Sequence, residues 1–313
     1  MAFNWQTFRT RALTALVFVA VMLTGLLWNH WSFFILFSII HFGCWVEYQK
    51  LVGLIDKGYQ EISPFHKYGV MIAGWCIMLY FTNNAYNIFG FSLHEIGWWL
   101  GLIFVFTLPI IELLFAKQVL PKNIGYSAFG LVYISLSIGL MVKLNSYDAF
   151  DIFRMERQYH SHIESFGGFG LTPIVIIFSL WVNDTMAYLV GSFIGRTPLS
   201  KISPKKTWEG TIGGIILCII AIGFLFSSNF SLFITRNHQE GFPFSINNIH
   251  WFVIAGISAI AGTFGDLLES KLKRMARVKD SGHIMPGHGG FLDRFDSLLL
   301  AIPFVWLYVY FFI

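Results

Sequence analysis

The chain has 313 residues, of which 56% are hydrophobic and 18% aromatic, while only 12% are charged. Soluble globular domains carry roughly 25% charged residues, so this composition excludes a soluble single-core fold and the disordered classes. The net charge of +4 does not indicate a nucleic-acid-binding protein, because the charges gather along the flanks of apolar segments.

Apolar runs, most of them near the 20 residues that cross a bilayer as a helix, follow one another along the chain. We therefore predict an all-α, polytopic transmembrane bundle of about nine spans. The second and third runs are short for a hydrocarbon core of about 30 Å, so interfacial residues could complete them or they could be partly re-entrant. The predicted spans cover residues 12–28, 31–46, 68–82, 98–116, 124–142, 172–194, 210–227, 250–268 and 294–313.

Lys and Arg residues predict the orientation, because the cytoplasmic connections of membrane proteins are enriched in both. With a cytoplasmic N-terminus, all but four of the 21 Lys and Arg residues fall in inside segments. The four exceptions are Lys143, Arg154, Arg157 and Arg236. A bias of this size, alternating correctly across the spans, predicts that the N-terminus is cytoplasmic.

The second half of the chain holds the connections that are richest in functional groups. Two predicted cytoplasmic loops, at residues 195–209 and 267–293, are dense in Gly, Pro, Lys, Ser and His, and each follows a span that contains a carboxylate. We predict an N-terminal transmembrane region over residues 1–170, with about five spans, and a C-terminal catalytic transmembrane region over residues 171–313, with about four.

Asp184 lies deep in the sixth predicted span, about 15 Å from its cytoplasmic end at 1.5 Å per residue. A carboxylate at this depth costs free energy unless it faces a partner or a water-filled cavity. It either joins Asn183 and Thr185 in a polar helix-packing cluster or contributes to a functional site. The cost of burying it favours the functional interpretation.

The first cytoplasmic loop, with its continuation to residue 210, combines lysines, hydroxyl groups and backbone amides just before a helix start. Such a loop suits a polyphosphate, because ammonium groups and the positive end of a helix both attract anions. The alternative is a positively charged anchor that binds anionic lipid headgroups. Composition leaves both interpretations open.

The second loop, with the helices on either side of it, carries Asp266, Asp293 and Asp296. Asp293 and Asp296 are three residues apart at a predicted helix start, so their side chains share a face. With Asp266 they could form a cage for Mg²⁺, which typically takes one or two protein carboxylates plus substrate phosphates. The alternative is a pair of first-turn carboxylates favoured by the helix dipole, with Arg294 as a surface ion-pair partner.

These carboxylates and lysines all fall on the predicted cytoplasmic face, where nucleotides are available. Phosphoryl-type transfer needs this pairing, because cations neutralise charge on the transferring group and align the attacking and leaving atoms. The chain has no GxxxxGK[ST], GxGxxG, HExxH or GxSxG motif, so the nucleotide-binding and hydrolase classes with those motifs are not indicated.

The motifs in these segments resemble those of the phosphatidate cytidylyltransferases, also called CDP-diacylglycerol synthases. That family's C-terminal signature combines a Ser-x-x-Lys-Arg element, a Lys-Asp pair, a His-Gly-Gly element and an Asp-Arg-x-Asp element. The resemblance covers the second half of the chain. The first five spans resemble the family only in their pattern of apolar spans. The matching elements are Ser270-x-x-Lys273-Arg274, Lys279-Asp280, His288-Gly289-Gly290 and Asp293-Arg294-Phe295-Asp296, with Asp184-x-x-Ala187-Tyr188-x-x-Gly191 and the 203–210 run Ser-Pro-Lys-Lys-Thr-Trp-Glu-Gly upstream.

The resemblance implies a nucleotidyltransferase of phospholipid biosynthesis that transfers CMP from CTP to phosphatidate, giving CDP-diacylglycerol and pyrophosphate. It implies in-line attack by the lipid phosphate and Mg²⁺ as cofactor, with a second cation left open. The active site would be a polar funnel that faces the cytoplasm and opens sideways, because acyl chains leave lipid only at a cost of about 0.8 kcal/mol per CH₂.

The resemblance also implies roles for individual residues. Asp266 and Asp293 would hold Mg²⁺, with Asp296 completing or supporting the cage, and these three with Lys273 form the expected catalytic set. Asp184 would reach the metal site or orient lysines. The expected substrate-binding residues are Asp184, Ser203, Lys205, Lys206, Ser270, Arg274, His288 and Arg294.

Two other functions remain open on the sequence. A CTP-dependent polyprenol or lipid kinase would transfer the γ-phosphoryl group to an alcohol and would be expected to lack the full signature from His288 to Asp296. A membrane transporter could use Asp184 as a coupling carboxylate, but it predicts repeated halves with broken helices, which the sequence does not show. The expected setting is a bacterial cytoplasmic (inner) membrane, since no transit peptide is evident, and the resemblance suggests a homodimer.

Overall fold

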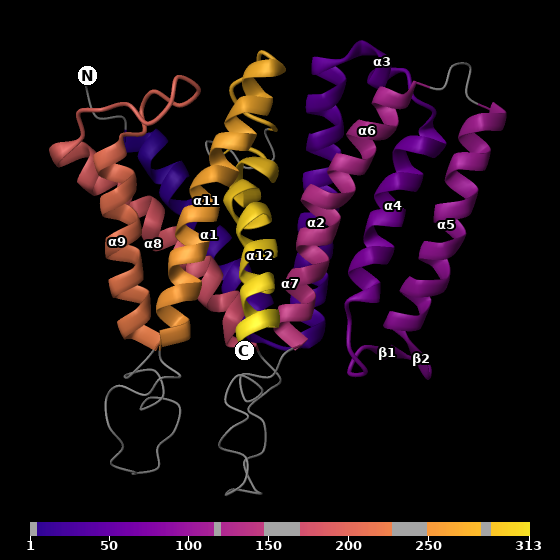
Figure 1. Cartoon of the computed structure of the whole chain (residues 1–313), viewed down its shortest axis with the longest axis horizontal. Coiled ribbons are helices and arrows are strands. Elements are labelled where there is room, and N and C mark those ends of the chain that lie inside the picture. The colour runs from indigo at the N-terminus through magenta and orange to yellow at the C-terminus, as the bar shows by residue number, and fades with distance from the viewer. Residues whose placement is uncertain (1–4, 116–119, 147–169, 227–248, 283–288) are drawn as a thin grey trace, which may run out of the picture. The chain divides into compact units, whose positions relative to one another are not determined.

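The computed structural model describes residues 5–115, 120–146, 170–226, 249–282 and 289–313. The regular secondary structure of this part of the chain is helical apart from one small antiparallel hairpin, so the predicted all-α class is confirmed (Figure 1). In chain order the elements are α1 (Trp5–Leu27), α2 (His30–Ile55), α3 (Lys57–Gln60), α4 (Pro64–Tyr80), β1 (Asn87–Ile88), β2 (Phe91–Ser92), α5 (Leu93–Phe115), α6 (Pro121–Gly130), the π-helical turn η1 (Leu131–Leu136), α7 (Ser137–Ser146), α8 (Leu171–Ile194), α9 (Trp208–Phe224), α11 (Ile249–Met275) and α12 (Leu292–Phe312).

The described residues form two compact units. The first unit holds α1 to α7 and the segment Lys271–Phe295, which contains the end of α11 and the start of α12. The second unit holds α8, α9 and the remaining parts of α11 and α12. The C-terminal signature segment therefore belongs largely to the same unit as the N-terminal helices. The division predicted between residues 170 and 171 follows chain order alone and stays a prediction.

Six helical stretches among the described residues are long and apolar enough to cross a membrane, so the chain is an integral multi-pass membrane protein. The apolar parts of α1 and α9 are shorter, and α4 has 17 residues. Each of the nine predicted spans overlaps a helical stretch, but nine crossings stay a prediction. The six stretches are His30–Ile55, Leu93–Leu114, Pro121–Ser146, Leu171–Ile194, Ile249–Met275 and Leu292–Phe312.

Helix α2 is longer than the second predicted span. It has 26 residues, or about 39 Å at 1.5 Å per residue, so residues beyond the apolar run lengthen it and the predicted end at residue 46 is wrong. The predicted span ends at residue 46 because Glu47 and Gln49 are polar, yet both side chains are buried in the structure. Buried polar groups therefore hide the last nine residues of this 26-residue helix, 47–55, from a prediction based on hydropathy.

The core of the first unit surrounds α2 and includes buried polar groups with partners. Phe37 and Trp45 are fully buried. The indole Nε1 of Trp45 donates to the Ser135 hydroxyl at 2.8 Å, and His41 Nε2 lies 3.0 Å from the same oxygen. Ser135 belongs to η1, and such π-helical turns mark local departures from regular helix geometry. One hydroxyl in η1 thus anchors two side chains of α2.

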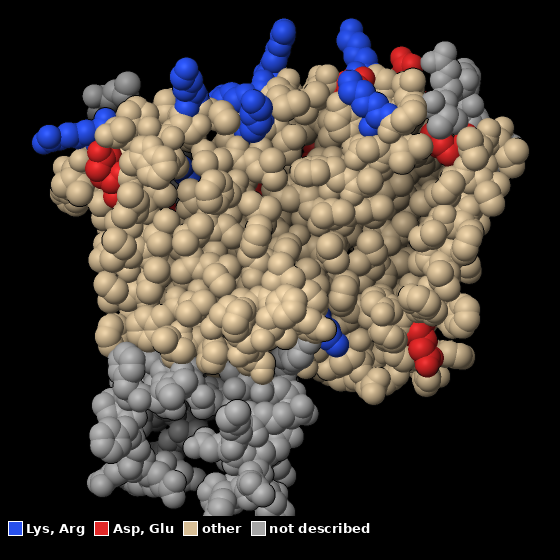
Figure 2. Space-filling view, viewed as in Figure 1, with Lys and Arg blue, Asp and Glu red and all other residues tan. Residues whose placement is uncertain are grey.

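Large apolar side chains cover the outer faces of the helices. On α5, Val105, Phe106, Leu113 and Leu114 are 65–71% exposed, which is the exposure expected of side chains that face lipid rather than a protein core. On the face seen in Figure 2, Lys and Arg gather mainly at one end of the helices, next to a broad band without charge. This surface suits a hydrocarbon environment.

Helices α8 and α9 approach each other closely because small residues line their contact. A Cβ atom added at Gly214 would lie 2.7 Å from Ala187 Cβ, and one added at Gly210 would lie 2.9 Å from Gly191 Cα. Small residues let helix backbones come together where lipid offers no hydrophobic driving force. Ala187 and Gly191 of the 184–191 motif therefore serve helix packing.

We expect Gly214→Ala to lower the melting temperature of the detergent-solubilised protein, because the new methyl group overpacks the α8–α9 contact. The expected loss in the free energy of unfolding is about 1–3 kcal/mol. Gly125→Ala is the matched control, since a Cβ atom at Gly125 meets nothing within 4 Å. Equal melting temperatures for Gly214→Ala and the wild type would contradict the close contact.

Candidate active site

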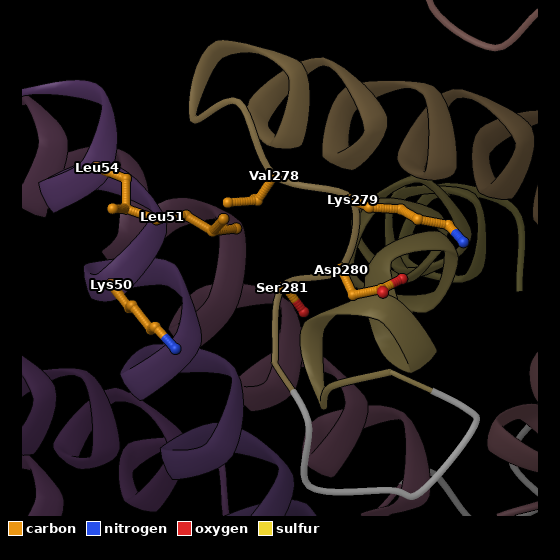
Figure 3. A pocket seen from close by; sticks show the side chains of 7 residues that line it. All are labelled: Lys50, Leu51, Leu54, Val278, Lys279, Asp280 and Ser281. Carbon is orange, nitrogen blue, oxygen red and sulfur yellow. The ribbon is translucent and has the colours of Figure 1, made fainter.

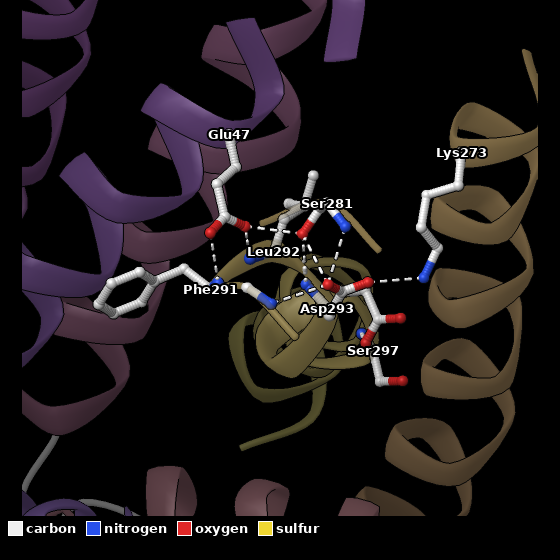
Figure 4. A network of polar contacts seen from close by, with 9 residues as sticks. Glu47, Lys273, Ser281, Phe291, Leu292, Asp293 and Ser297 are labelled. Carbon is white, nitrogen blue, oxygen red and sulfur yellow. Dashed lines mark hydrogen bonds and ion pairs between the residues drawn. The ribbon is translucent and has the colours of Figure 1, made fainter. Parts of the chain in front are cut away.

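Asp293 is the centre of a hydrogen-bond network in the first unit (Figure 4). It lies in the first turn of α12, where unpaired helix N–H groups favour negative charge. Its Oδ1 atom forms an ion pair with Lys273 Nζ at 2.7 Å. Its Oδ2 atom accepts from the Ser281 amide at 2.9 Å, the Ser281 hydroxyl at 2.9 Å and the Gly290 amide at 2.8 Å. The structure thus brings Lys273 and Asp293 together and adds Ser281.

Two glycines of the signature provide the space that this network needs. Gly289 has φ +84°, a conformation that glycine adopts readily and other residues adopt with strain. A Cβ atom there would lie 2.7 Å from Asp293 Oδ2, and one at Gly290 would lie 2.2 Å from Glu47 Oε2. The Gly-Gly pair therefore lets two carboxylates come close to the backbone.

Glu47 on α2 is a neighbour of this network that the sequence prediction missed. Its side chain is 3% exposed, and its carboxylate accepts from the Ser281 hydroxyl at 2.7 Å and from the amides of Phe291 and Leu292 at 2.9 and 2.8 Å. An acidic residue within a helix of apolar neighbours is a signal that could have found it. Its partners lie 234 to 245 residues away in sequence, so no local pattern identifies them.

A pocket of about 250 Å³ adjoins the network within the first unit (Figure 3). Its wall combines apolar side chains with two lysines and one aspartate, so its charge favours an anionic group. Ser281 belongs to both the pocket wall and the Asp293 network. The lining residues are Lys50, Leu51, Leu54, Val278, Lys279, Asp280 and Ser281.

In the second unit, two predicted site residues form an ion pair. Asp266 Oδ2 and Lys206 Nζ lie 2.7 Å apart, and the two side chains are 28% and 32% exposed. Both side chains are half-buried, and the Asp266 Oδ2 atom itself is buried. Lys206 and Asp266 therefore pair a carboxylate with an ammonium group, as Asp293 and Lys273 do in the first unit.

Glu209, in the first turn of α9, holds the loop that carries the lysines. Its carboxylate accepts from the amides of Arg196 and Thr197, both at 3.1 Å, and from the Thr197 hydroxyl at 2.8 Å. The backbone amide of Glu209 itself and these donors lower the pKa of its carboxyl to about 2. An antiparallel bridge between Pro198 and Thr207 also closes the loop. The loop therefore has a defined conformation, although Glu209 was not among the predicted site residues.

The remaining predicted site residues differ in exposure. Asp296 is 6% exposed, and its Oδ1 atom accepts from the Ser297 amide at 2.6 Å. Asp184 is exposed on α8. Lys205, Arg274 and Arg294 are also exposed, Ser203 and Ser270 are half-buried, and His288 lies outside the described residues.

The carboxylates suit Mg²⁺ in chemical kind, since this ion prefers oxygen ligands and commonly takes one or two from protein. The described ranges contain no group of three His, Cys, Asp or Glu residues arranged to hold a metal ion. Asp266 and Asp293 are each paired with a lysine. A cation that arrives with a phosphate would match such a pair, with the cation at the carboxylate and the phosphate at the ammonium group.

We expect Glu209→Ala to increase the rate at which trypsin cleaves the detergent-solubilised protein after Lys201 and Lys205, because the loop loses its carboxylate acceptor. Mass spectrometry of the limited digest measures the two cleavages. Glu95→Ala, at the start of α5, is the control and leaves them unchanged. Cleavage of Glu209→Ala at the wild-type rate would show that Glu209 does not order the loop.

Comparison with known proteins shows which family the chain is similar to. The family model described as the cytidylyltransferase family matches residues 9–312. Phosphatidate cytidylyltransferase of Haemophilus influenzae is 39% identical over 165 residues, which are 52% of each chain. The enzyme of that name from Bacillus subtilis is 33% identical over 202 residues, 62% of this chain and 63% of the relative. Phosphatidate cytidylyltransferase 1 of Rattus norvegicus is 34% identical over 176 residues, 44% and 37% of the two chains.

The alignments cover less than two thirds of each of these three relatives. The family model, in contrast, extends along almost the whole chain, from the start of the first apolar helix to the end of α12. The chain therefore belongs to the cytidylyltransferase family.

Proposed function

We propose that the protein is a phosphatidate cytidylyltransferase, which transfers CMP from CTP to phosphatidate and releases pyrophosphate. The observation that carries this proposal is the network around Asp293, where Lys273, Gly289 and Gly290 of the signature meet in a chain of the cytidylyltransferase family. The names of the bacterial and rat relatives support the same activity. The product, CDP-diacylglycerol, would feed phospholipid biosynthesis.

In the proposed reaction, a phosphate oxygen of phosphatidate attacks the α-phosphorus of CTP. The bond between the α-phosphorus and the oxygen that bridges to the β-phosphate breaks, so pyrophosphate leaves with the electron pair. A phosphate monoester has its second pKa near 6 and is largely ionised at neutral pH, so the protein needs no strong general base. Orientation of the substrates and neutralisation of their charge then lower the barrier.

We propose that Asp266 and Asp293 hold Mg²⁺, with Asp296 in support. When bound, the ion would neutralise phosphate charge and polarise the reacting phosphoryl group. Lys273 is proposed to bind a phosphate oxygen and to complete the catalytic set. The 2.7 Å ion pair between Lys273 and Asp293 supports these roles, because a cation and a phosphate present the complementary charges to it.

Apart from Asp184, the proposed substrate-binding groups donate hydrogen bonds or carry positive charge, as phosphate recognition requires. Lys206 is supported by its ion pair with Asp266, and the ordered loop that Glu209 holds supports the roles of its neighbours. Asp184 is proposed to orient lysines of this loop. The full proposed set is Asp184, Ser203, Lys205, Lys206, Ser270, Arg274, His288 and Arg294.

We also propose nine membrane crossings, a cytoplasmic N-terminus and a polar funnel that opens to the cytoplasm and sideways to lipid. The positive-inside distribution of Lys and Arg supports the orientation. The proposed setting is a bacterial inner membrane, and the proposed assembly is a homodimer. Selective labelling of cysteines introduced into the loops from either side of inverted vesicles tests the orientation.

The activity test uses the purified protein in detergent with phosphatidate, Mg²⁺ and CTP labelled at the α-phosphorus. Label entering the lipid with equimolar pyrophosphate supports the proposal. Release of CDP without labelled lipid would indicate a kinase instead. Folded protein that consumes no CTP would overturn the proposal.

We expect Asp293→Asn to reduce kcat by at least about a thousandfold, because it removes a carboxylate proposed to hold the Mg²⁺ that neutralises the reacting phosphates. Asp56→Asn is the matched control, since Asp56 also forms an ion pair with a lysine, Lys122, at 2.6 Å. The control should retain wild-type kcat. An active Asp293→Asn variant would remove Asp293 from the catalytic set.

We expect Lys206→Ala to raise KM for CTP or phosphatidate about tenfold or more, because a charged hydrogen bond contributes roughly 1.5–3 kcal/mol. Lys205→Ala should raise KM less, since Lys205 is exposed and Lys206 is partly buried. Lys201→Ala serves as a control from the same loop. Steady-state kinetics with each substrate varied in turn measure these effects. Unchanged KM in both Lys205→Ala and Lys206→Ala would indicate that the loop anchors the protein to anionic lipid headgroups instead.

A further inference from the structure

We propose that Glu47 is a positioning residue for cytidylyl transfer, because it holds the Ser281 hydroxyl and the backbone at the start of α12 and thereby fixes the orientation of Asp293. The proposal rests on the function proposed above. Glu47 is assigned no contact with either substrate. It acts through Ser281 and through the helix that carries Asp293.

Glu47 caps α12 from a helix that is distant in sequence. The first N–H groups of a helix have no partner within that helix, and a side chain just before the helix usually accepts from one of them. At α12 the carboxylate of Glu47 accepts from the amides of Phe291 and Leu292, at 2.9 and 2.8 Å. The direction in which α12 begins therefore depends on the position of α2.

Ser281 links the two carboxylates (Figure 4). Its hydroxyl oxygen lies 2.7 Å from Glu47 Oε2 and 2.9 Å from Asp293 Oδ2. A hydroxyl group has one proton, so it donates to one carboxylate at a time. Each carboxylate also has backbone donors, so neither depends on the Ser281 proton alone. Movement of Glu47 would therefore displace the Asp293 carboxylate through both Ser281 and the α12 backbone.

The surrounding backbone is shaped to fit the Glu47 side chain. A Cβ atom at Gly282 would lie 2.1 Å from Glu47 Oε1, and one at Gly290 would lie 2.2 Å from Oε2. One turn earlier on α2, a Cβ atom at Gly43 would lie 2.5 Å from the ring of Phe291. Three glycines thus allow α2 and the signature segment to approach closely around one carboxylate.

The charge of Glu47 is needed as well as its shape. A carboxylate accepts at both oxygens, whereas the amide of glutamine presents an NH₂ donor on one side. Glu47→Gln would therefore set a donor against the Phe291 amide or against the Leu292 amide and Ser281. A buried donor left without an acceptor is destabilising, so the segment would shift to relieve it.

The test measures kcat, KM and backbone protection in Glu47→Gln and Glu47→Asp. We expect kcat of Glu47→Gln to fall roughly 10–100-fold, the range found when groups that orient metal ligands are changed, while KM for CTP changes much less. Glu47→Asp keeps the charge and should recover part of kcat. Hydrogen exchange at Phe291 and Leu292 should become faster in Glu47→Gln.

Glu61→Gln is the control, because Glu61 is an exposed carboxylate outside the network, and both kcat and exchange should match the wild type. Gly282→Ala gives a second route to the same change, since its methyl group displaces the Glu47 carboxylate without removing the charge. It also carries the test if Glu47→Gln does not fold.

Wild-type kcat and wild-type exchange in the folded Glu47 variants would overturn the proposal. Lost activity with unchanged exchange at Phe291 and Leu292 would also overturn it, because Glu47 would then act directly on the substrates. If the wild type makes no CDP-diacylglycerol, the proposed function fails. The exchange measurement would still show separately whether Glu47 orders the start of α12.

Discussion

A helix that begins within a protein exposes N–H groups that need acceptors, and two carboxylates accept from the amides at and just before the start of α12. Glu47 accepts from Phe291 and Leu292, and Asp293 accepts from Gly290. The positive end of the helix in turn stabilises both charges. The glycines and Ser281 around them follow from this arrangement, since each supplies either space or a donor.

Two aspartates of the candidate site each have a lysine as ion-pair partner. Asp293 with Lys273 and Asp266 with Lys206 are each separated by 2.7 Å. A carboxylate without a partner would be an uncompensated negative charge close to hydrocarbon, which costs several kcal/mol. Pairing with lysine reduces that cost, and in the proposed function a phosphate bound with its cation would replace the internal partners one for one.

The sequence predicts what is local, and the structure adds what depends on distant contacts. Hydropathy located the helical stretches because a span needs its own apolar run. The resemblance of the signature to that of the family pointed to Lys273 and Asp293, which the structure joins. Glu47 escaped prediction because its partners are more than 230 residues away. The end of α2 was misplaced for the same reason, since a buried, hydrogen-bonded Glu47 does not stop a helix.

The separation of 234 residues between Glu47 and Ser281 also constrains how the protein is made. Ribosomes add about 5–20 residues per second, so α2 waits on the order of ten seconds or more for the donors that satisfy its carboxylate. During membrane insertion Glu47 must therefore be kept near water or pair with a temporary partner. A segment made late thus completes the contacts of a helix made much earlier, and the network around Asp293 forms only after residues 281–292 have been made.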